Sequence, residues 1–290
     1  MIEVLRAGLC DLVMDLGRPG WGALGVPAGG AADPAALAAA NRLVGNADNA
    51  AGLEIAVSGP ALRFPAGGVV ALTGAHFAAT RSTGAPAAWN ETLVLAAGET
   101  LSLGPAETGC RCWLALRGGL DVPLLMGSCS TFLPSGFGGH QGRALQAGDQ
   151  LALGEGAGEM HLLRACPPPV EPDTPLRVVV GPQAGQFDDT GLAAFFGGRY
   201  RVDVASDRRG VRLVGAAVTH AQAELPSQGV LPGAIQVPPD GQPIILGWDG
   251  PVTGGYPVIA AVIAADWPKL AQLKPGDAVR FATIEAAAAQ

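Results

Sequence analysis

Hydrophobic residues occur along this chain in short runs separated by glycine, proline and polar residues. Several runs alternate with period two, which is typical of strands joined by tight turns. The pattern therefore predicts a mainly β protein of barrel or sandwich type. The predicted strands cover residues 2–13 (an opening pair), 53–57, 61–64, 69–73, 92–95, 100–103, 112–116, 150–153, 176–180, 234–237, 243–246, 258–264 and 279–283.

Helices are expected at only three places. Asp33 suits the N-cap, Pro34 the first helical position and Gly45 the C-terminal end of a helix over about residues 34–44. Two shorter helices are predicted over residues 187–196 and 267–273. The helices are therefore few and short.

Length and proline placement predict two subdomains. A chain of 290 residues holds about two domains of ordinary size. Residues 166–175 are rich in proline and predict an extended linker. We expect an N-terminal barrel-like subdomain over residues 1–165, which includes helix 34–44. A C-terminal barrel-like subdomain with glycine- and proline-rich loops is expected over residues 176–290.

Composition excludes several classes of protein. Hydrophobic residues make up 49% of the chain and charged residues 15%, which excludes a disordered chain. A net charge of -7 argues against a nucleic-acid partner. The first residues do not have the pattern of a signal peptide, and no apolar run reaches the roughly 20 residues that span a bilayer. We expect a cytoplasmic protein that does not bind membranes.

The cysteines predict neither disulfides nor a metal site. Five are present, an odd number that fits reduced thiols. Cys110 and Cys112 share a strand face, and no second Cys or His pair lies near them in the sequence. Core packing is therefore favoured over zinc binding.

Glycine, proline and hydrogen-bonding residues concentrate in residues 224–257. Residues 238–241, with a Pro-Asp-Gly sequence, predict a tight turn between two strands. Polar side chains on such turns could face a small ligand, although a plain hairpin with a glycine-rich loop explains the composition as well. The polar residues of the stretch are Gln228, Gln236, Asp240, Gln242, Asp249, Thr253 and Tyr256.

Three further loops carry candidate binding groups. Arg18 could present its guanidinium to a carboxylate or phosphate, or form a local pair with Asp15. Arg208 follows Asp207 and lies two residues before Gly210 in a similar loop. Ser128 and Ser130 could bind an anion or an oxyanion, or only satisfy the backbone of their turn.

Several nucleotide, metal and cofactor motifs are absent from the sequence. It has no P-loop, no glycine-rich dinucleotide fingerprint and no H-E-x-x-H zinc motif. It also lacks a biotin attachment site of the Met-Lys-Met type. We therefore expect no metal ion and no biotin on this chain.

Many short motifs resemble one family in their order and spacing. Together they extend from about residue 5 to residue 284. They are Asp15-Leu-Gly-Arg18, Leu24-Gly-Val-Pro27, Ala40-Asn-Arg-Leu-Val-Gly-Asn46, Leu53-Glu54, Gly59-Pro60, Leu72-Thr-Gly-Ala75, Arg117-Gly-Gly-Leu-Asp-Val-Pro123, Gly127-Ser-Cys-Ser-Thr131, Phe137-Gly-Gly139, Ser206-Asp-Arg208, Gly233-Ala-Ile-Gln-Val-Pro-Pro-Asp-Gly-Gln-Pro243 and Thr253-Gly-Gly-Tyr-Pro257. The chain resembles the KipA, or allophanate-hydrolase-subunit-2-like, family, which includes the C component of the prokaryotic 5-oxoprolinase. This family is also similar to the carboxyltransferase domain, subdomains A and B, of urea carboxylase.

The resemblance implies a cyclophilin-like β-barrel architecture in two barrel-like subdomains. It also implies a protein that is inactive alone and acts with two partners, the KipI-like B component and the A component of 5-oxoprolinase. The complex would convert 5-oxoproline to L-glutamate with ATP, which the complex rather than this chain alone would bind. One alternative is a carboxyltransferase component that transfers carboxylate from the biotin of another protein to a urea-like or amide substrate. Another is a non-catalytic regulator that binds a KipI-like kinase inhibitor.

A lactam or amide substrate needs donors for its carbonyl oxygen, acceptors for its N–H and a cation for its carboxylate. Under this resemblance we expect Asp240, Gln242 and Thr253 to be catalytic. The expected substrate-binding residues are Arg18, Arg208, Gln236, Gly254, Gly255, Tyr256, Ser128 and Ser130. Cys129, Gln228 and Val258 depart from the family pattern, which usually has Arg, Glu and a basic residue there.

Overall fold

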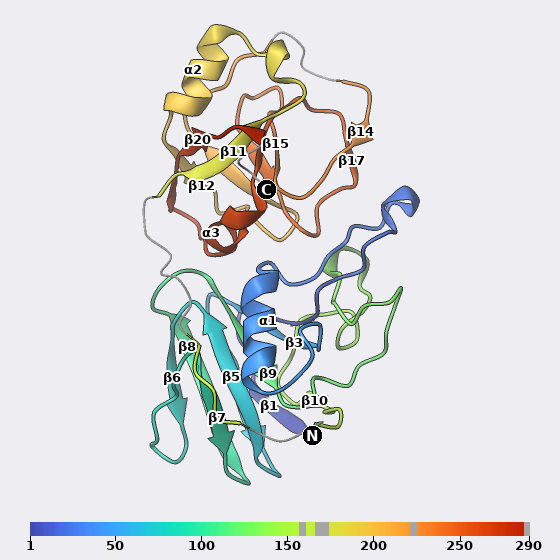
Figure 1. Ribbon diagram of the computed structural model, residues 1–290, viewed down its shortest axis with the longest axis vertical. Helices are drawn as coiled ribbons and strands as arrows, with labels where there is room; N and C mark the ends of the chain where they lie inside the picture. The colour runs from blue at the N-terminus through green and yellow to red at the C-terminus, as the bar shows by residue number, and fades with distance from the viewer. Residues whose placement is uncertain (157–160, 166–173, 221–224, 287–290) are drawn as a thin grey trace. The chain divides into compact units, whose positions relative to one another are not determined.

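The computed structural model describes residues 1–156, 161–165, 174–220 and 225–286 (Figure 1). It divides into two compact units. Unit 1 comprises Met1–Arg18 and Gly29–Pro168, and unit 2 comprises Pro19–Ala28 and Pro169–Gln290. Residues 19–28 thus group with unit 2, although the sequence predicts them in the N-terminal subdomain. Most of the proposed linker over 166–175 lies outside the described residues.

In the residues that the structure describes, unit 1 contains two five-stranded antiparallel sheets and one α-helix. The strand orders are β10-β1-β4-β8-β6 and β2-β3-β9-β5-β7. The first sheet contains β1 (Ile2–Arg6), β4 (Ala61–Phe64), β6 (Phe77–Arg81), β8 (Glu99–Ala106) and β10 (Gln150–Leu151). The second contains β2 (Cys10–Met14), β3 (Gly52–Ala56), β5 (Gly68–Gly74), β7 (Thr92–Leu95) and β9 (Arg111–Leu116). A 3-10 helix, η2 (Leu133–Ser135), lies in a later loop.

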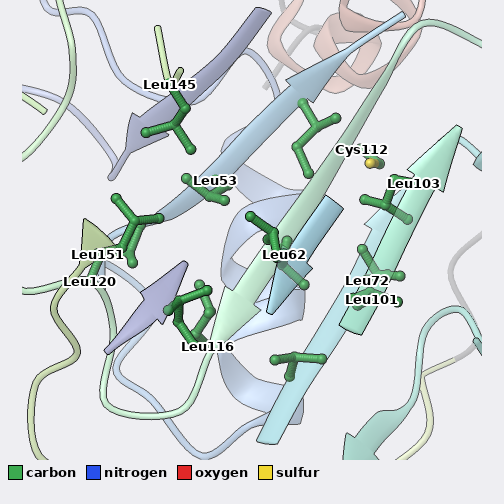
Figure 2. Packing of buried hydrophobic residues seen from close by; sticks show 14 of the residues in the cluster. Leu53, Leu62, Leu72, Leu101, Leu103, Cys112, Leu116, Leu120, Leu145 and Leu151 are labelled. Carbon is green, nitrogen blue, oxygen red and sulfur yellow. The ribbon is translucent and has the colours of Figure 1, made fainter. Parts of the chain in front are cut away.

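The core of unit 1 is formed by side chains from both sheets. Leu62 and Leu101 from the first sheet belong to the same buried cluster as Leu53 and Leu72 from the second (Figure 2). Cys112 packs in this cluster, which confirms the prediction that it is a core residue. Burial of each of these leucine side chains contributes roughly 1.5–3 kcal/mol to the stability of the fold.

Both faces of β9 are buried, because helix α1 (Pro34–Leu43) covers the face opposite the core (Figure 1). On that face Ala115 packs with Ala40 and Leu43 of the helix. Asp33 caps α1 by accepting a hydrogen bond from the Ala36 N–H at 3.0 Å. Gly45 follows the helix with a φ of 74°, which favours glycine. The predicted helix and both of its end signals are therefore confirmed.

Unit 2 contains an eight-stranded sheet that forms a nearly closed barrel. Its order is β19-β12-β13-β16-β15-β18-β11-β20. The edge strands β19 and β20 are separated in sequence by Arg280 alone, so the two edges of the sheet come close together. The strands are β11 (Leu176–Val180), β12 (Tyr200–Val202), β13 (Gly210–Val214), β15 (Ala234–Gln236), β16 (Ile244–Leu246), β18 (Val258–Val262), β19 (Ala278–Val279) and β20 (Phe281–Thr283). A separate pair joins β14 (Gln228–Gly229) and β17 (Thr253–Gly254).

The helices of unit 2 are short. They are α2 (Asp189–Gly197), α3 (Trp267–Ala271) and the 3-10 helices η1 (Gly22–Leu24), η3 (Ala184–Gln186) and η4 (Ala264–Asp266). The prediction of a mainly β protein with barrel architecture and few helices is therefore confirmed. In the described part of the chain, no helix combines the length and apolar character needed to cross a membrane.

In the described part of the chain, sequence reasoning missed the strands β6, β12 and β13 and the two-residue strands β14 and β17. In β6 only Phe77 is buried, and in β12 and β13 an exposed arginine separates the buried residues. Their apolar positions are too few to form a recognisable run, and their pairing with neighbours decides their conformation. The predicted strand over 150–153 shortens to the two residues of β10.

Asp11, in β2 of unit 1, has a buried carboxyl group. It is 1% exposed, and its Oδ1 has no hydrogen-bond partner among the described residues. Desolvation raises its pKa to about 6, against the opposing effects of the Gly8 N–H and the Arg6 charge. Because folding raises this pKa, the folded state binds the proton more tightly than the unfolded state does. Stability should therefore fall as pH rises from about 4 to about 6.

We expect Asp11→Asn to stabilise unit 1 above pH 6. A shift of about two pKa units corresponds to roughly 3 kcal/mol, so the gain at pH 8 should be up to about that value. At pH 4 the gain should nearly vanish, because the carboxyl group is then protonated in the fold. Urea denaturation at both pH values measures the change, with the exposed Asp121→Asn as control. An equal effect of Asp11→Asn at pH 4 and pH 8 would contradict this account.

Candidate functional site

In unit 1, the predicted serines gather around the buried carboxylate of Asp15, which is 1% exposed. Its Oδ1 accepts hydrogen bonds from the Ser128 and Ser130 hydroxyls, both at 2.6 Å, and from the Gly17 N–H at 2.8 Å. Its Oδ2 accepts one from the Cys129 N–H at 2.6 Å. The carboxylate thus connects the loop after β2 to the loop over residues 127–131, more than 100 residues later, which we call the serine loop.

Arg18 joins the same network. Its side chain is 1% exposed, Nη2 donates to the Ser130 carbonyl, and the guanidinium carbon lies 5.0 Å from the centroid of the Phe137 ring. Asp15 and Arg18 are therefore linked through Ser130, which binds one by its hydroxyl and the other by its carbonyl. The structure brings Arg18, Ser128 and Ser130 together, and their described contacts hold two loops in place.

Cys129 lies in this serine loop, where the family pattern has Arg. Burial, followed by the nearby charges of Asp15 and Asp121, raises the pKa of its thiol. The thiol is therefore not an activated nucleophile at neutral pH. Its Sγ contacts the Val122 carbonyl oxygen at 3.7 Å.

In unit 2, Asp240 and Gln242 shape the turn between β15 and β16. Asp240 Oδ1 accepts a hydrogen bond from the Gln242 N–H at 3.0 Å, an arrangement common in turns. The amide of Gln242 pairs with the backbone of Gly215, accepting from its N–H at 2.9 Å and donating to its carbonyl at 3.4 Å. These contacts fix the turn to the end of β13, and the carboxylate of Asp240 remains exposed.

Arg208 binds Asp249 through a two-point ion pair. Its Nε donates to Oδ2 at 2.8 Å and its Nη2 donates to Oδ1 at 3.1 Å. The side chains are 9% and 1% exposed. The Asp249 N–H also donates to the Arg208 carbonyl at 3.2 Å. The pair therefore pins the glycine-rich loop before β17 to the loop before β13.

Gln236, Gly254, Gly255 and Tyr256 come together in unit 2. Gln236 is 4% exposed, and its Nε2 donates to the Tyr256 carbonyl at 3.2 Å. A Cβ at Gly254 would lie 2.6 Å from Gln236 Nε2, and one at Gly255 would lie 2.6 Å from the Leu225 carbonyl oxygen. Gly255 therefore needs to be glycine, because a Cβ would meet the backbone, whereas a Cβ at Gly254 would require the end of the Gln236 side chain to shift. Thr253 lies next to them, exposed, in β17.

Sequence reasoning missed Gln183, which connects two positions that depart from the family pattern. Its Oε1 accepts from the Val258 N–H at 3.1 Å, and its Nε2 donates to Gln228 Oε1 at 3.2 Å. Gln228 in turn lies directly opposite Gly254 in the β14–β17 pair. Gln183 lies outside the resembling motifs, and no pattern in the sequence links it to residues 45 and 75 positions away.

The geometry of this second cluster suits recognition of a planar amide. Gln236 approaches Gly254, Gln228 pairs with Gly254 across the two strands, and Gln183 contacts Gln228. Each of the three amide groups can donate or accept a hydrogen bond. They are uncharged, so they match a neutral carbonyl or N–H group better than an ion. We name Gln183, Gln228, Gln236, Gly254 and Gly255 the glutamine cluster.

Comparison with known proteins finds one family and several relatives. The family model described as "Carboxyltransferase domain, subdomain A and B" matches residues 24–283. The chain is 40% identical to the C component of 5-oxoprolinase from Escherichia coli, over 97% of this chain and 90% of that protein. It is 33% identical to the urea amidolyase of Lachancea kluyveri, over 97% of this chain but 17% of that enzyme.

A solved structure shows the same relationship in three dimensions. The urea carboxylase of Kluyveromyces lactis superposes with a TM-score of 0.91 at 33% identity. The match covers 99% of this chain and 28% of that one. The arrangement of strands in this chain is thus the arrangement found in part of a larger carboxylase.

Proposed function

We propose, because this chain belongs to the family of carboxyltransferase domains with subdomains A and B, that it is the C component of an ATP-dependent 5-oxoprolinase. In this role it acts with the KipI-like B component and the A component, and it is inactive alone. The complex opens the lactam of 5-oxoproline to give L-glutamate.

One observation carries this proposal. The E. coli 5-oxoprolinase component and this chain match over nearly the full length of both, at 40% identity. The urea amidolyase of Lachancea kluyveri also matches 97% of this chain, but the match covers only 17% of that enzyme. The chain is therefore similar to nearly the whole of the E. coli component, but to only a small part of the urea amidolyase.

Within the complex, we assign recognition of the lactam to the glutamine cluster. The ring has one carbonyl and one N–H, which require a donor and an acceptor. Glutamine amides provide both, and the two glycines let the backbone approach closely. Thr253 and Tyr256 lie beside the cluster, and Asp240 provides an exposed carboxylate in unit 2. Catalytic roles for Asp240, Gln242 and Thr253 remain part of the proposal.

The sequence shows no lysine-based site for the phosphates of ATP. The sequence has no P-loop and only two lysines. Lys269 lies 3.2 Å from Asp266, and Lys274 lies 3.9 Å from Asp277. The N-terminus of α1 is capped by the carboxylate of Asp33. We therefore propose that the complex, rather than this chain alone, binds ATP.

The proposal is tested by measuring glutamate release from 5-oxoproline and ATP. We expect release from this chain combined with its two partner components, and none when this chain is omitted. Alanine at Thr253 should slow turnover in an assembled complex. The absence of glutamate from an assembled complex would refute the proposal. Carboxylation of a urea-like substrate by carboxybiotin, or tight partner binding without turnover, would then identify one of the two alternatives.

A further inference from the structure

Two loops of unit 1 expose apolar side chains immediately before and after the buried serines. Residues 123–127, Pro-Leu-Leu-Met-Gly, are all exposed, and Leu124 is 68% exposed. In the second loop, over residues 133–136, Leu133 is exposed as well. We call residues 123–127 and 133–136 the apolar tips. A single exposed leucine is ordinary on a protein surface, but a run of consecutive exposed apolar residues indicates a contact with another molecule.

Arg18 connects the bases of both tips. Its Nε donates a long hydrogen bond of 3.5 Å to the Leu125 carbonyl, and its guanidinium carbon lies 5.0 Å from the centroid of the Phe137 ring. Phe137 pairs with Phe132 across the second tip. At the base of the first tip, the Leu125 N–H donates to the Ser128 carbonyl at 2.9 Å. One buried cation thus holds both tips in a fixed relation to each other.

The turn of the first tip has a conformation that only its surroundings can maintain. Met126 has a φ of 54°, in the left-handed region that residues other than glycine rarely adopt, and Gly127 follows with a φ of 81°. Such a residue persists where neighbouring contacts determine its conformation, and it is often found at binding sites. A rigid tip loses little conformational entropy when it binds, so this construction suits a surface that docks against a partner.

The sequence of the tips limits the chemistry of that partner. No Asp, Glu, Lys, Arg or His occurs over residues 122–139, although the whole chain has a net charge of -7. A partner that binds through charge therefore finds no counterpart there, whereas an uncharged apolar groove does. The E. coli relative is named as one component of an enzyme, which favours a different polypeptide over a second copy of this chain. The KipI-like B component is the partner in both the 5-oxoprolinase and the regulator functions.

We propose that the apolar tips of this chain insert into an uncharged, apolar groove of the KipI-like B component. The inference rests on the proposed function for the identity of this partner. The buried contacts of Asp15 and Arg18 then hold the serine loop and both tips in the shape that the groove accepts. Leu124, the most exposed large apolar side chain of the tips, provides the central contact.

Titration calorimetry of this chain with the purified B component tests the proposal. We expect Leu124→Ser to weaken binding about tenfold or more, because the apolar surface that the contact removes from water is lost. Leu124→Met keeps a similar apolar volume and should bind nearly as the wild type does. Leu9→Ser is the matched control, because Leu9 is 67% exposed in the same unit and lies outside the tips. It should leave the affinity unchanged.

Hydrogen exchange of the wild-type chain gives a second readout that needs no variant. Peptides over residues 121–137 should exchange more slowly once the B component is added. Unchanged exchange there, or equal affinities of Leu124→Ser and Leu9→Ser, would overturn the inference. Sedimentation that shows the tips joining two copies of this chain would also overturn it, as would binding of the A component alone at the tips.

The outcomes separate this inference from the proposed function. Glutamate release by a complex that contains Leu124→Ser, with unchanged affinity for the B component, supports the function and overturns the inference. Weaker binding of the B component by Leu124→Ser supports the inference, even if the wild-type complex releases no glutamate. Failure of the wild-type chain to bind the B component overturns the inference directly.

Discussion

Arg208→Ala should destabilise unit 2 by about 3–5 kcal/mol, because it leaves the carboxylate of Asp249 buried without its cation. Asp249 is 1% exposed and receives two hydrogen bonds from the guanidinium. The loss should loosen the glycine-rich loop that leads to Thr253. Hydrogen exchange measured by mass spectrometry reports this as faster exchange in peptides of unit 2, with peptides of unit 1 unchanged.

The neighbouring Arg209 is a matched control. It also pairs with an aspartate, Asp207 at 2.9 Å, but these side chains are 61% and 46% exposed. Arg209→Ala should therefore cost less than about 1 kcal/mol. Equal effects of the two substitutions would show that burial does not determine the contribution of the Arg208–Asp249 pair. Arg208→Lys should restore part of the stability, because one ammonium cannot replace both hydrogen bonds.

Asp15→Ala should destabilise unit 1 by at least about 3 kcal/mol. It removes the acceptor of four hydrogen bonds at 2.6–2.8 Å, two from buried serine hydroxyls and two from backbone N–H groups. Asp15→Asn should also destabilise, because one of the two accepting oxygens becomes an NH₂ group, which donates and cannot accept. Urea denaturation measures the free energy of unfolding of both variants. Hydrogen exchange shows whether the loss of stability lies in unit 1.

Two controls separate loss of the network from loss of a charge. Asp48→Ala removes an exposed carboxylate that pairs with Arg42 in the same unit, and it should leave the stability nearly unchanged. Ser128→Ala removes one hydroxyl from the network and should cost less than Asp15→Ala. If Ser128→Ala costs as much, the carboxylate is not the centre of the network.

The candidate site was only partly predictable from sequence. Turn residues and glycines identified the stretch over 224–257, where Gln236, Gly254 and Gly255 come together. The sequence could not show that Gln242 is engaged by the backbone of Gly215, because that contact spans 27 residues. Arg18 and Arg208 were predicted as possible carboxylate-binding residues, but sequence did not reveal that their groups bind Ser130 and Asp249.

Local patterns by themselves determined the fold class of this protein. Short alternating runs with glycine and proline between them can bury their apolar faces only as paired strands. Asp33, Pro34 and Gly45 set the ends of α1, because caps act within one helical turn. Tertiary structure alone decided which polar groups meet. Gln183 contacts Val258 and Gln228, far away in sequence, because it follows β11, which pairs with β18 in the barrel sheet.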